Sequence, residues 1–316
     1  MSEIKSKTAL TAQDVADILK IAKNTVYELI KRGEINHYKV GRKVRFTQAD
    51  VDDYIASFRR AVPAAPRSDE IAWSPLALPP STRNFIICGQ DLMLDVLSNY
   101  LSRHPLGRPA LRAHIGSYNG LSALYRGEVQ AATCHLWDGD TGEYNTPFVR
   151  RLLPGIRAVV IRLTWRTQGL YVAKGNPLGL TGWKDFLRSD VTMINRETGA
   201  GSRVLLDEHL RLLGVYGRDV RGYATEGQSH HAVASAVGRR QVDVAVGHQK
   251  AAEQVGGVEF IPLQKERYDL VVKREDMGEP VIKALLEILR LPRFKQEFES
   301  MGGYELDDMG EIVAET

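Results

Sequence analysis

Apolar residues recur at helical spacing in two short segments near the start of the chain. Each segment places such residues three or four positions apart, which puts them on one face of a helix. They are Val15, Ile18 and Leu19 in the first segment and Val26, Leu29 and Ile30 in the second. Thr11 stands three residues before Asp14, the spacing of a capping box, and Gly33 follows the second segment. This pattern predicts a helix-turn-helix.

Two runs with strand character follow this pair of helices. They cover residues 35–40 and 43–46 on either side of Gly41-Arg42, which predicts a β-hairpin. Thr47 and Asp50 repeat the capping-box spacing, and the apolar stripe at 51–58 predicts a third helix over a small core. Residues 1–58 are therefore expected to form an α+β winged helix-turn-helix unit.

The periodic pattern is lost from residue 59 to residue 83. This segment holds five of the chain's 13 prolines, mixed with Ala and Ser, and is typical of an extended spacer. Trp73 within it is a candidate contact for a neighbouring surface or for a second copy of the chain.

Beyond residue 84, short apolar runs alternate with amphipathic helical segments. This order is typical of an α/β unit with a mostly parallel sheet, and a helical, amphipathic tail is expected over 280–301. Runs near Leu163–Tyr171 and Pro262–Tyr268 are expected to cross between two α/β groups. The order predicts a hinged, two-lobed α/β domain over 84–316, with lobe I at about 84–165 and 264–316 and lobe II at about 166–263.

Loops at the carboxyl ends of the expected strands supply a candidate ligand site. Ligands of open α/β sheets bind there, where helix N-termini offer an anion free N–H groups and a favourable dipole. The candidate residues are the side chains of Gln90, Ser117, Ser202 and Ser229, backbone donors around Asn119, Gly120, Gly199 and Gly201, and the cations Arg196 and Arg203. His135 is placed to line a pocket or to be a satisfied core histidine. Each serine could equally be a plain helix cap.

Positive charge is concentrated in the first unit. The 316-residue chain carries a formal charge of only +3, whereas residues 1–60 hold 12 Lys and Arg against 8 Asp and Glu. The basic residues of the region 23–45 are Lys23, Lys31, Arg32, Lys39, Arg42, Lys43 and Arg45, and only two acidic residues accompany them. Such a patch attracts DNA phosphates, although a protein-binding module could also carry a solvated basic face.

Residues 9–58 resemble the excisionase-type winged helix-turn-helix of the MerR-like group. The order of elements, Asn24-Thr25-Val26-Tyr27 and the wing at 40–46 carry the resemblance. Lys20 stands where the family favours Gly, and Ala22 stands where it favours a capping Ser or Thr. The resemblance implies major-groove contacts by Lys23, Asn24, Thr25 and Tyr27, and contacts to the DNA backbone or minor groove by Arg42 and Lys43.

Residues 84–300 resemble the periplasmic-binding-protein-like domain, of type II, found in cytoplasmic bacterial regulators. The resemblance is carried by Gly116-Ser117-Tyr118-Asn119-Gly120-Leu121, His135-Leu136 with the loop 141–145, Asn195-Arg196 with the loop 199–203, and the segment 232–246. Some members of that family respond to molybdate or tungstate. Gln90 stands where a small hydroxyl residue is more usual.

Other classes of protein lack support in the sequence. Cys88 and Cys134 fall in apolar runs and are expected to be buried free thiols in a reducing cytosol. There is no long uncharged apolar run, export signal, Walker loop, dinucleotide fingerprint or nucleophile elbow. Adjacent His230 and His231 would point to different faces of a helix, so no shared metal is expected. We therefore expect no catalytic residue, no cofactor and no membrane partner.

These patterns predict a cytoplasmic one-component transcriptional regulator that binds a double-stranded DNA operator. Molybdate or tungstate is the leading candidate for its small anionic effector. Because one short recognition helix reads only a few base pairs, a homodimer or higher homo-oligomer is expected. The alternatives are the same architecture with an organic acid or pterin-like effector, a soluble solute-binding protein, and an enzyme that uses the cleft.

Overall fold

The chain forms two compact units. The computed structural model describes residues 9–41, 43–59 and 85–316. The units are Met1–Ser74 and Pro75–Thr316. Residues 60–83 of the expected spacer, including Trp73, lie outside the described residues.

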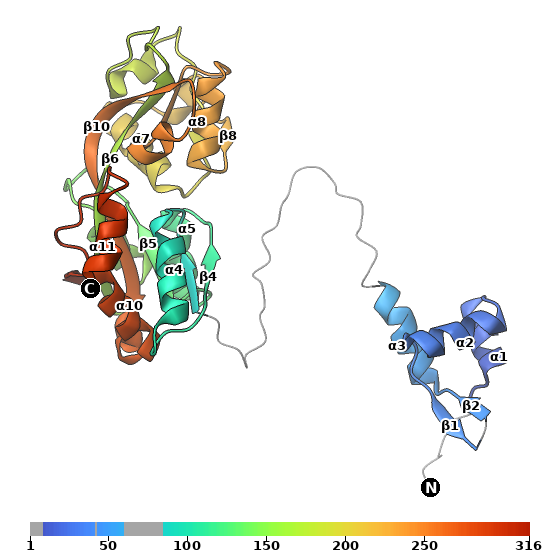
Figure 1. Cartoon of the computed structure of the whole chain (residues 1–316). Coiled ribbons are helices and arrows are strands. Elements are labelled where there is room, and N and C mark those ends of the chain that lie inside the picture. Colours follow the sequence, from blue (N-terminus) through green and yellow to red (C-terminus); the bar gives the residue numbers. More distant parts are fainter. Residues whose placement is uncertain (1–8, 42, 60–84) are drawn as a thin grey trace. The chain divides into compact units, whose positions relative to one another are not determined.

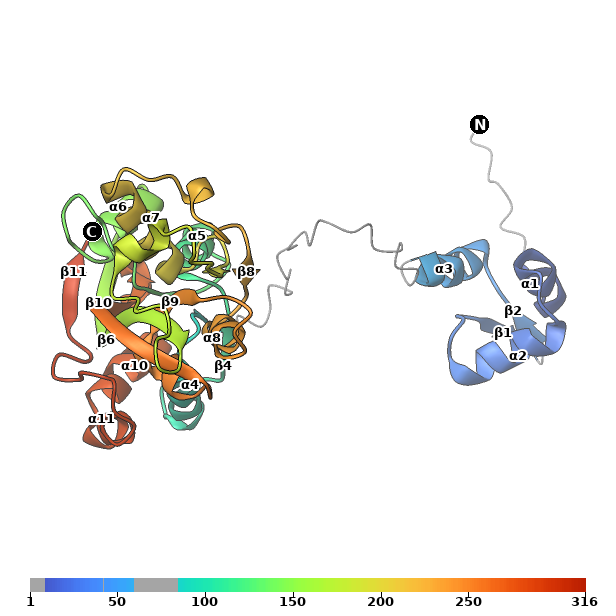
Figure 2. The same ribbon diagram turned by 90° about the horizontal axis from the view of Figure 1, so that it is seen from above.

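The N-terminal unit contains three helices and a two-stranded antiparallel hairpin, which can be followed in Figures 1 and 2. The elements are α1 (Ala12–Leu19), α2 (Lys23–Arg32), β1 (Tyr38–Val40), β2 (Lys43–Arg45) and α3 (Gln48–Arg59). The expected capping box is present, since the backbone N–H of Thr11 donates to the Asp14 carboxylate and the N–H of Asp14 donates to Thr11 Oγ1. Thr47 and Asp50 form the same pair at the start of α3.

A small apolar core joins these helices to the hairpin. Val15 of α1, Val26 of α2, Phe46 and Val51 are fully buried in it. Ile18 was expected on the buried face of α1, but its side chain is 42% exposed. The buried stripe of α1 runs through Ala12, Val15 and Ala16, and Ile18 is turned away from that stripe by the 3.6-residue helical repeat.

The C-terminal unit has two lobes connected by two long antiparallel strands, β6 (Ala158–Ala173) and β10 (Val258–Lys273). Figure 1 shows both strands passing from the lobe with α4 and α5 to the lobe with α7 and α8, and Figure 2 views these elements from above. The expected crossing strands are therefore confirmed. Because the connections are continuous strands, one sheet runs through both lobes.

The first lobe contains β3 (Phe85–Cys88), α4 (Met93–Arg103), β4 (Ala110–Ala113), α5 (Ser117–Arg126), β5 (Ala131–Cys134), α6 (Thr146–Leu152), η3 (Arg274–Gly278), α10 (Pro280–Arg290), α11 (Pro292–Glu299) and β11 (Ile312–Glu315). The second lobe contains η1 (Trp183–Leu187), β7 (Asn195–Arg196), α7 (Gly201–Leu212), η2 (Gly217–Asp219), β8 (Glu226–Gly227), α8 (His230–Gly238), β9 (Val244–His248) and α9 (Gln249–Glu253). Cys88 and Cys134 are buried free thiols, as expected.

The expectation of a mostly parallel sheet is wrong. The strand order is β11-β6-β10-β5-β3-β4, with β9 also paired to β6. Only the pairs of β3 with β4 and with β5 are parallel, whereas the pairs that involve β6 or β10 are antiparallel. The sheet is mixed because the two crossing strands run in opposite directions through its middle.

The expected helical tail at 280–301 is formed by two helices. Leu291 has an extended backbone, with φ −69° and ψ 127°, and separates α10 from α11. Pro292 follows it, and a proline disfavours the helical conformation in the preceding residue while fitting the first turn of a new helix. This local steric restriction ends α10 at Arg290.

Candidate functional site

The second helix of the N-terminal unit presents its DNA-contacting candidates to solvent. Val26 and Leu29 pack into the core, which turns the opposite face of α2 outward. The exposed candidates on α2 are Lys23, Asn24, Thr25, Tyr27, Lys31 and Arg32. In the hairpin, Lys43 is exposed, whereas Arg45 is half-buried and donates to a neighbouring backbone carbonyl. Arg42 lies outside the described residues.

The turn before α2 has the two departures noted in the sequence. Lys20 adopts a left-handed backbone conformation, with φ 57° and ψ 42°, which favours glycine. Ala22 is the N-cap of α2 and makes no side-chain capping hydrogen bond. The helix that carries the DNA-contacting candidates is therefore weakly specified at its start.

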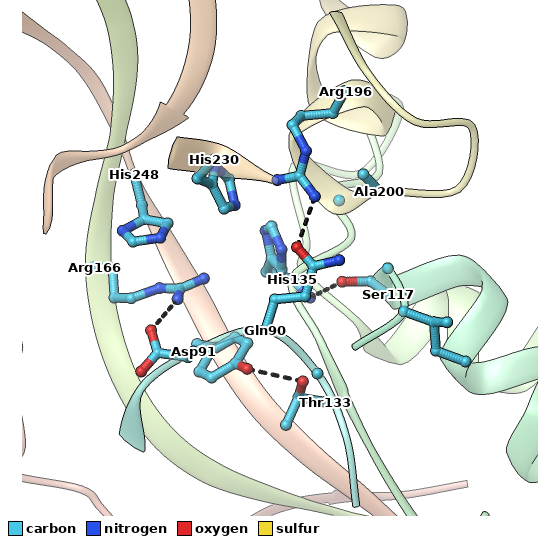
Figure 3. A pocket seen from close by; sticks show the side chains of 15 residues that line it. Gln90, Asp91, Ser117, Thr133, His135, Arg166, Arg196, Ala200, His230 and His248 are labelled. Carbon is cyan, nitrogen blue, oxygen red and sulfur yellow. Dashed lines mark hydrogen bonds and ion pairs between the residues drawn. The ribbon is translucent and has the colours of Figure 1, made fainter. Parts of the chain in front are cut away.

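A small cavity of about 20 Å³, partly open to solvent, lies in the cleft of the C-terminal unit. We call it the cleft cavity. Its lining from the first lobe is Gly89, Gln90, Asp91, Ile115, Gly116, Ser117, Thr133, His135 and Tyr268. From β6 and the second lobe, Arg166, Arg196, Ala200, Gly201, His230 and His248 complete it. Both lobes thus contribute to one site, which Figure 3 shows from close by.

Arg166 of β6 is the buried cation of this cavity, with a relative exposure of 5%. Its Nη1 lies 2.5 Å from Asp91 Oδ2, and its Nε donates to Glu266 Oε1 at 2.7 Å. The guanidinium also lies over the ring of Tyr268, 4.0 Å from the ring centroid. His135 Nδ1 lies 2.7 Å from the other oxygen of Glu266. These groups form one buried charged cluster at the floor of the cavity.

Arg166 keeps both buried carboxylates of this cluster ionised. Burial by itself would raise the pKa of Asp91 and of Glu266, because a low dielectric disfavours charge. Arg166, together with neighbouring histidines and hydrogen-bond donors, outweighs burial and holds both pKa values below their ordinary range. His135 adds to this effect at Glu266. The cluster is therefore charged at neutral pH, with its cation already paired.

Arg196 enters the cavity from the second lobe, beside Gln90 of the first lobe (Figure 3). Its Nη2 donates to Gln90 Oε1 at 2.7 Å and to Glu197 Oε1 at 2.8 Å. Gln90 Nε2 in turn donates to the same Glu197 carboxylate at 3.1 Å. Gln90, predicted as a ligand contact, thus also connects the two lobes in this arrangement.

Two imidazole rings lie on the wall of the cavity without hydrogen-bond partners. His230 and His248 are 8% and 9% exposed, and their ring centroids lie 4.4 Å apart. Neither Nδ1 atom has a partner among the described residues. Burial lowers the pKa of both rings, to about 3 for His248, and nearby Arg side chains add to that effect. Both rings are therefore neutral at physiological pH and can donate or accept a hydrogen bond.

Two helix N-termini face the cavity from opposite lobes. Ser117 begins α5 in the first lobe, and Gly201 and Ser202 begin α7 in the second. The backbone N–H groups of these three residues have no acceptor in the described part of the chain. First-turn amides of a helix have no intrahelical acceptor, and the helix dipole adds a favourable potential for negative charge. The arrangement can bind an anionic group between the lobes.

The lobes are in direct contact around the cavity. The backbone N–H of Tyr118 donates to Gly199 O at 3.0 Å, and Asn119 Nδ2 donates to Thr198 O at 3.0 Å. Glycine is required where the contact is closest, since a Cβ on Gly201 would lie 2.5 Å from the His135 ring. The C-terminal unit therefore adopts a closed arrangement of its two lobes.

The structure brings five of the predicted ligand residues to the cavity and leaves six outside its lining. Gln90, Ser117, His135, Arg196 and Gly201 line it, whereas Asn119, Gly120, Gly199, Ser202, Arg203 and Ser229 do not. Their positions have structural explanations. Asn119 and Gly199 lie in the contact between lobes, and Gly120 packs on Cys88. The Ser202 hydroxyl donates to Gln168, Arg203 pairs with Glu226, and Ser229 accepts from the Ala232 N–H as a helix cap.

The sequence analysis missed Asp91, Thr133, Arg166, His230, His248 and Tyr268 as lining residues. A signal for Arg166 was present in the crossing strand. Arg162, Thr164, Arg166 and Gln168 occupy every second position there, with Leu163, Trp165 and Thr167 between them, and all four are buried. Polar residues at a period of two in an otherwise apolar strand share one face, and buried charges require partners. That pattern could have identified a polar interior on one face of β6.

Two negative findings bear on the site. No group of three or more His, Cys, Asp or Glu that could hold a metal ion occurs in residues 9–41, 43–59 and 85–316. Of the helices in the described segments, none has the length and apolar character needed to span a bilayer. His230 is buried and His231 is exposed, so the expected divergence of these two side chains is confirmed.

Comparisons with known proteins match both units. A family model described as the PBP superfamily domain matches residues 98–290, and a helix-turn-helix domain model matches residues 9–59. The uncharacterized protein YvgK of Bacillus subtilis (strain 168) is 41% identical over 309 residues, which cover 98% of this chain and 99% of that protein. An uncharacterized Clostridium pasteurianum protein, from the 5′ region of a ferredoxin 2Fe-2S gene, is 51% identical over 112 residues. That match covers 35% of this chain and 99% of that protein.

Solved structures with the same fold include a sulfate-binding protein and an OxyR mutant. The sulfate-binding protein SubI of Mycobacterium tuberculosis H37Rv matches with a TM-score of 0.53 and 12% identity, covering 71% of this chain and 87% of that chain. An H2O2-bound OxyR mutant of Corynebacterium glutamicum matches with a TM-score of 0.51 and 13% identity, covering 92% of this chain and 89% of that chain. At these identities the likeness shows the fold alone.

Proposed function

The chain belongs to the PBP superfamily domain family, joined to a helix-turn-helix domain, and from this membership we propose that it is a transcriptional regulator whose DNA binding responds to a small anion in the cleft. The family models and the fold support a helix-turn-helix regulator with a PBP-like domain. We further propose that the ligand is an anion, that DNA binding responds to it, and that the protein is an oligomer.

The proposal that the ligand is an anion rests on one observation: the N-termini of α5 and α7 meet at the cleft cavity from the two lobes. The free amides of Ser117 and Gly201, which line the cavity, are donors that are already fixed in position. Because these donors come from both lobes, an anion between them favours the closed arrangement over an open one. A ligand changes a conformational equilibrium only by such a difference in affinity.

Molybdate or tungstate is the first inorganic candidate, because of the family resemblance and the unpaired amides at the helix N-termini. A sulfate-binding protein shares the fold, so this architecture is compatible with a tetrahedral oxyanion. Arg166 and Arg196 are each already paired with a carboxylate, which weakens the attraction for a dianion. An organic acid or pterin-like metabolite with a single negative charge is therefore the second candidate.

We also propose that the protein binds DNA as a homodimer or higher homo-oligomer and that the cleft binds its ligand without converting it. The dimer rests on the small number of base pairs that one short recognition helix such as α2 can read. The binding role rests on the engagement of Asp91 and Glu266 by Arg166, which leaves neither carboxylate free to act as a general base.

The test is fluorescence anisotropy of the full-length protein on a duplex from its own promoter, with and without molybdate, tungstate or an organic acid. We expect at least one anion to change the apparent affinity for DNA by roughly fivefold or more, the usual size of an allosteric coupling. Arg196→Ala should abolish this change. Arg218→Ala, at an exposed arginine far from the cavity lining, is the matched control and should retain it.

Either of two outcomes would reject the proposal. One is no binding to promoter duplexes under any of these conditions. The other is an anion response that persists at full size in Arg196→Ala, since the cleft cavity would then not be the sensing site.

A further inference from the structure

A second cavity adjoins the cleft cavity and is much wider. The two share Gln90, Asp91, His230 and His248 in their walls. The second cavity, which we call the outer cavity, has a volume of about 660 Å³ and is partly open to solvent, against about 20 Å³ for the cleft cavity. The rest of its lining is Leu92, His114, Gln228, Ser229, His231, Lys250, Gln254, Met301 and Tyr304.

We propose that the effector is an organic anion rather than an inorganic oxyanion. Its acidic group occupies the cleft cavity, and an apolar or aromatic body fills the outer cavity. The inference rests on the proposed function, because it takes the cleft as the effector site and specifies the class of molecule that fits it.

Closure of the two lobes leaves the outer cavity open. The lobes already touch through Arg196 and Gln90, which lie at the cleft cavity. They also touch where Lys250 Nζ of the second lobe donates to the backbone carbonyl of Met301 in the first lobe. Met301 and Lys250 line the outer cavity, so this second contact lies at its edge. A tetrahedral oxyanion would occupy only the smaller cavity and leave the larger one to water.

The wall of the outer cavity contains apolar and aromatic side chains. Leu92, Met301 and the ring of Tyr304 come from the first lobe, and the ring of His231 comes from the second. The cation of the wall, Lys250, is occupied by Glu253 and by the Met301 carbonyl. An apolar or aromatic group placed here loses contact with water and gains contact with these side chains.

Two buried histidines lie at the junction between the cavities. His230 and His248 lie on the shared wall, and their Nδ1 atoms are buried without a partner among the described residues. A buried polar atom without a hydrogen bond is unfavourable, so a ligand group at this point stabilises the site by supplying one. Because burial keeps both rings neutral, they suit an uncharged heteroatom such as a ring nitrogen or a carbonyl oxygen.

The effector should therefore be negatively charged at one end, carry a neutral hydrogen-bonding group in the middle and be apolar at the other end. Its two ends occupy different cavities, and each cavity is lined by residues of both lobes. This order of groups follows the order in which the two arginines, the two histidines and the apolar side chains line the path outward from the cleft cavity.

The experiment compares matched anions by calorimetric titration of the full-length protein. The pairs are acetate with benzoate and inorganic phosphate with phenyl phosphate, and molybdate and tungstate are titrated beside them. We expect an aromatic member to bind at least tenfold more tightly than its small counterpart. Leu92→Trp, which fills part of the outer cavity, should remove that advantage and leave the affinity for the small anion unchanged.

Leu106→Trp is the matched control. Leu92 and Leu106 are equally exposed, at 45% and 44%, but only Leu92 lines the outer cavity. The control should bind every anion as the unmodified protein does.

The inference is overturned if no aromatic anion binds more tightly than its small partner, or if Leu92→Trp leaves the aromatic advantage intact. Tight binding of molybdate or tungstate that is insensitive to Leu92→Trp also overturns it, while the proposed function stands. The proposed function fails separately if no anion of any kind changes the affinity for promoter DNA.

Discussion

Arg166 shows how one side chain sets the chemistry of the cleft. It lies in an apolar strand, yet its guanidinium contacts Asp91 from the loop after β3 and Glu266 from β10. The three groups are far apart in the sequence, since Arg166 is 75 positions from Asp91 and 100 positions from Glu266. Removing the arginine would leave two buried carboxylates without their guanidinium partner, and breaking a buried ion pair typically costs about 3–5 kcal/mol of stability.

The buried histidines make a prediction about pH at the same scale. Burial lowers the folded-state pKa of His248 to about 3 from its ordinary value of about 6.5, so the unfolded chain binds more protons between these limits. Stability of the C-terminal unit is therefore fully present above pH 6.5 and falls as the pH is lowered towards 3. His230 acts in the same direction.

We expect His248→Gln, which cannot be protonated, to lose about 1–2 kcal/mol less stability than the unmodified protein between pH 6.5 and 4.5. Urea unfolding followed by tryptophan fluorescence at several pH values measures this difference. His231→Gln, at the exposed neighbour of His230, is the control and should follow the unmodified protein. Coincident pH profiles for His248→Gln and the unmodified protein would contradict the prediction.

At the scale of single elements, local sequence accounts for the starts of several helices. The pairs Thr11 with Asp14 and Thr47 with Asp50 start α1 and α3 as capping boxes, and Pro292 starts α11. The helix α2 lacks such a cap, because Ala22 offers no side-chain acceptor to its first N–H groups.

Ala22→Ser should therefore stabilise α2 by about 1 kcal/mol. The backbone of Ala22 is already extended, with φ −73° and ψ 145°, so the serine hydroxyl could accept a hydrogen bond without a change of conformation. We expect hydrogen exchange of the amides at 26–32 to slow by roughly fivefold, the equivalent of that free energy. Ala22→Val adds bulk without an acceptor and should show no slowing; equal protection in both variants would mean that capping does not limit this helix.

At the scale of the C-terminal unit, a stack of three rings connects the lobes. Trp137 follows β5 in the first lobe, and its ring centroid lies 4.5 Å from that of His209 on α7. Trp183 of η1 stacks on the other side of His209, with a centroid separation of 4.0 Å. His209 Nε2 lies 2.8 Å from Gln264 Oε1 of β10, which holds the middle ring in place. The stack therefore favours the closed arrangement.

His209→Ala should weaken closure by removing the middle ring, since each aromatic contact contributes roughly 0.5–1.5 kcal/mol. We expect faster hydrogen exchange in the loop at 137–145 and an affinity about tenfold lower for any anion that changes DNA binding, which equals about 1.4 kcal/mol. Tyr216→Ala removes an aromatic ring that is 66% exposed and serves as the control. Unchanged exchange and affinity in His209→Ala would show that the stack does not contribute to closure.

The sequence alone determined the features that depend on neighbouring residues. The helix-turn-helix, its hairpin and the two α/β groups follow from apolar periods of about 3.6 and 2, and from caps and prolines, all of which act over a few residues. Gln90, Ser117, His135, Arg196 and Gly201 could be predicted at the cavity because each lies in a loop or a helix start near a strand end.

Only the tertiary structure decided which side chains meet. The mixed sheet depends on how β6 and β10 pair along their length, and that register brings Arg166 to Glu266. The hydrogen bond from Asn119 to Thr198 depends on how the lobes dock, and the capping role of Ser229 depends on where its helix starts. Periodicity specifies the face on which a residue lies, but partners far apart in sequence are chosen by strand register and packing of the whole unit.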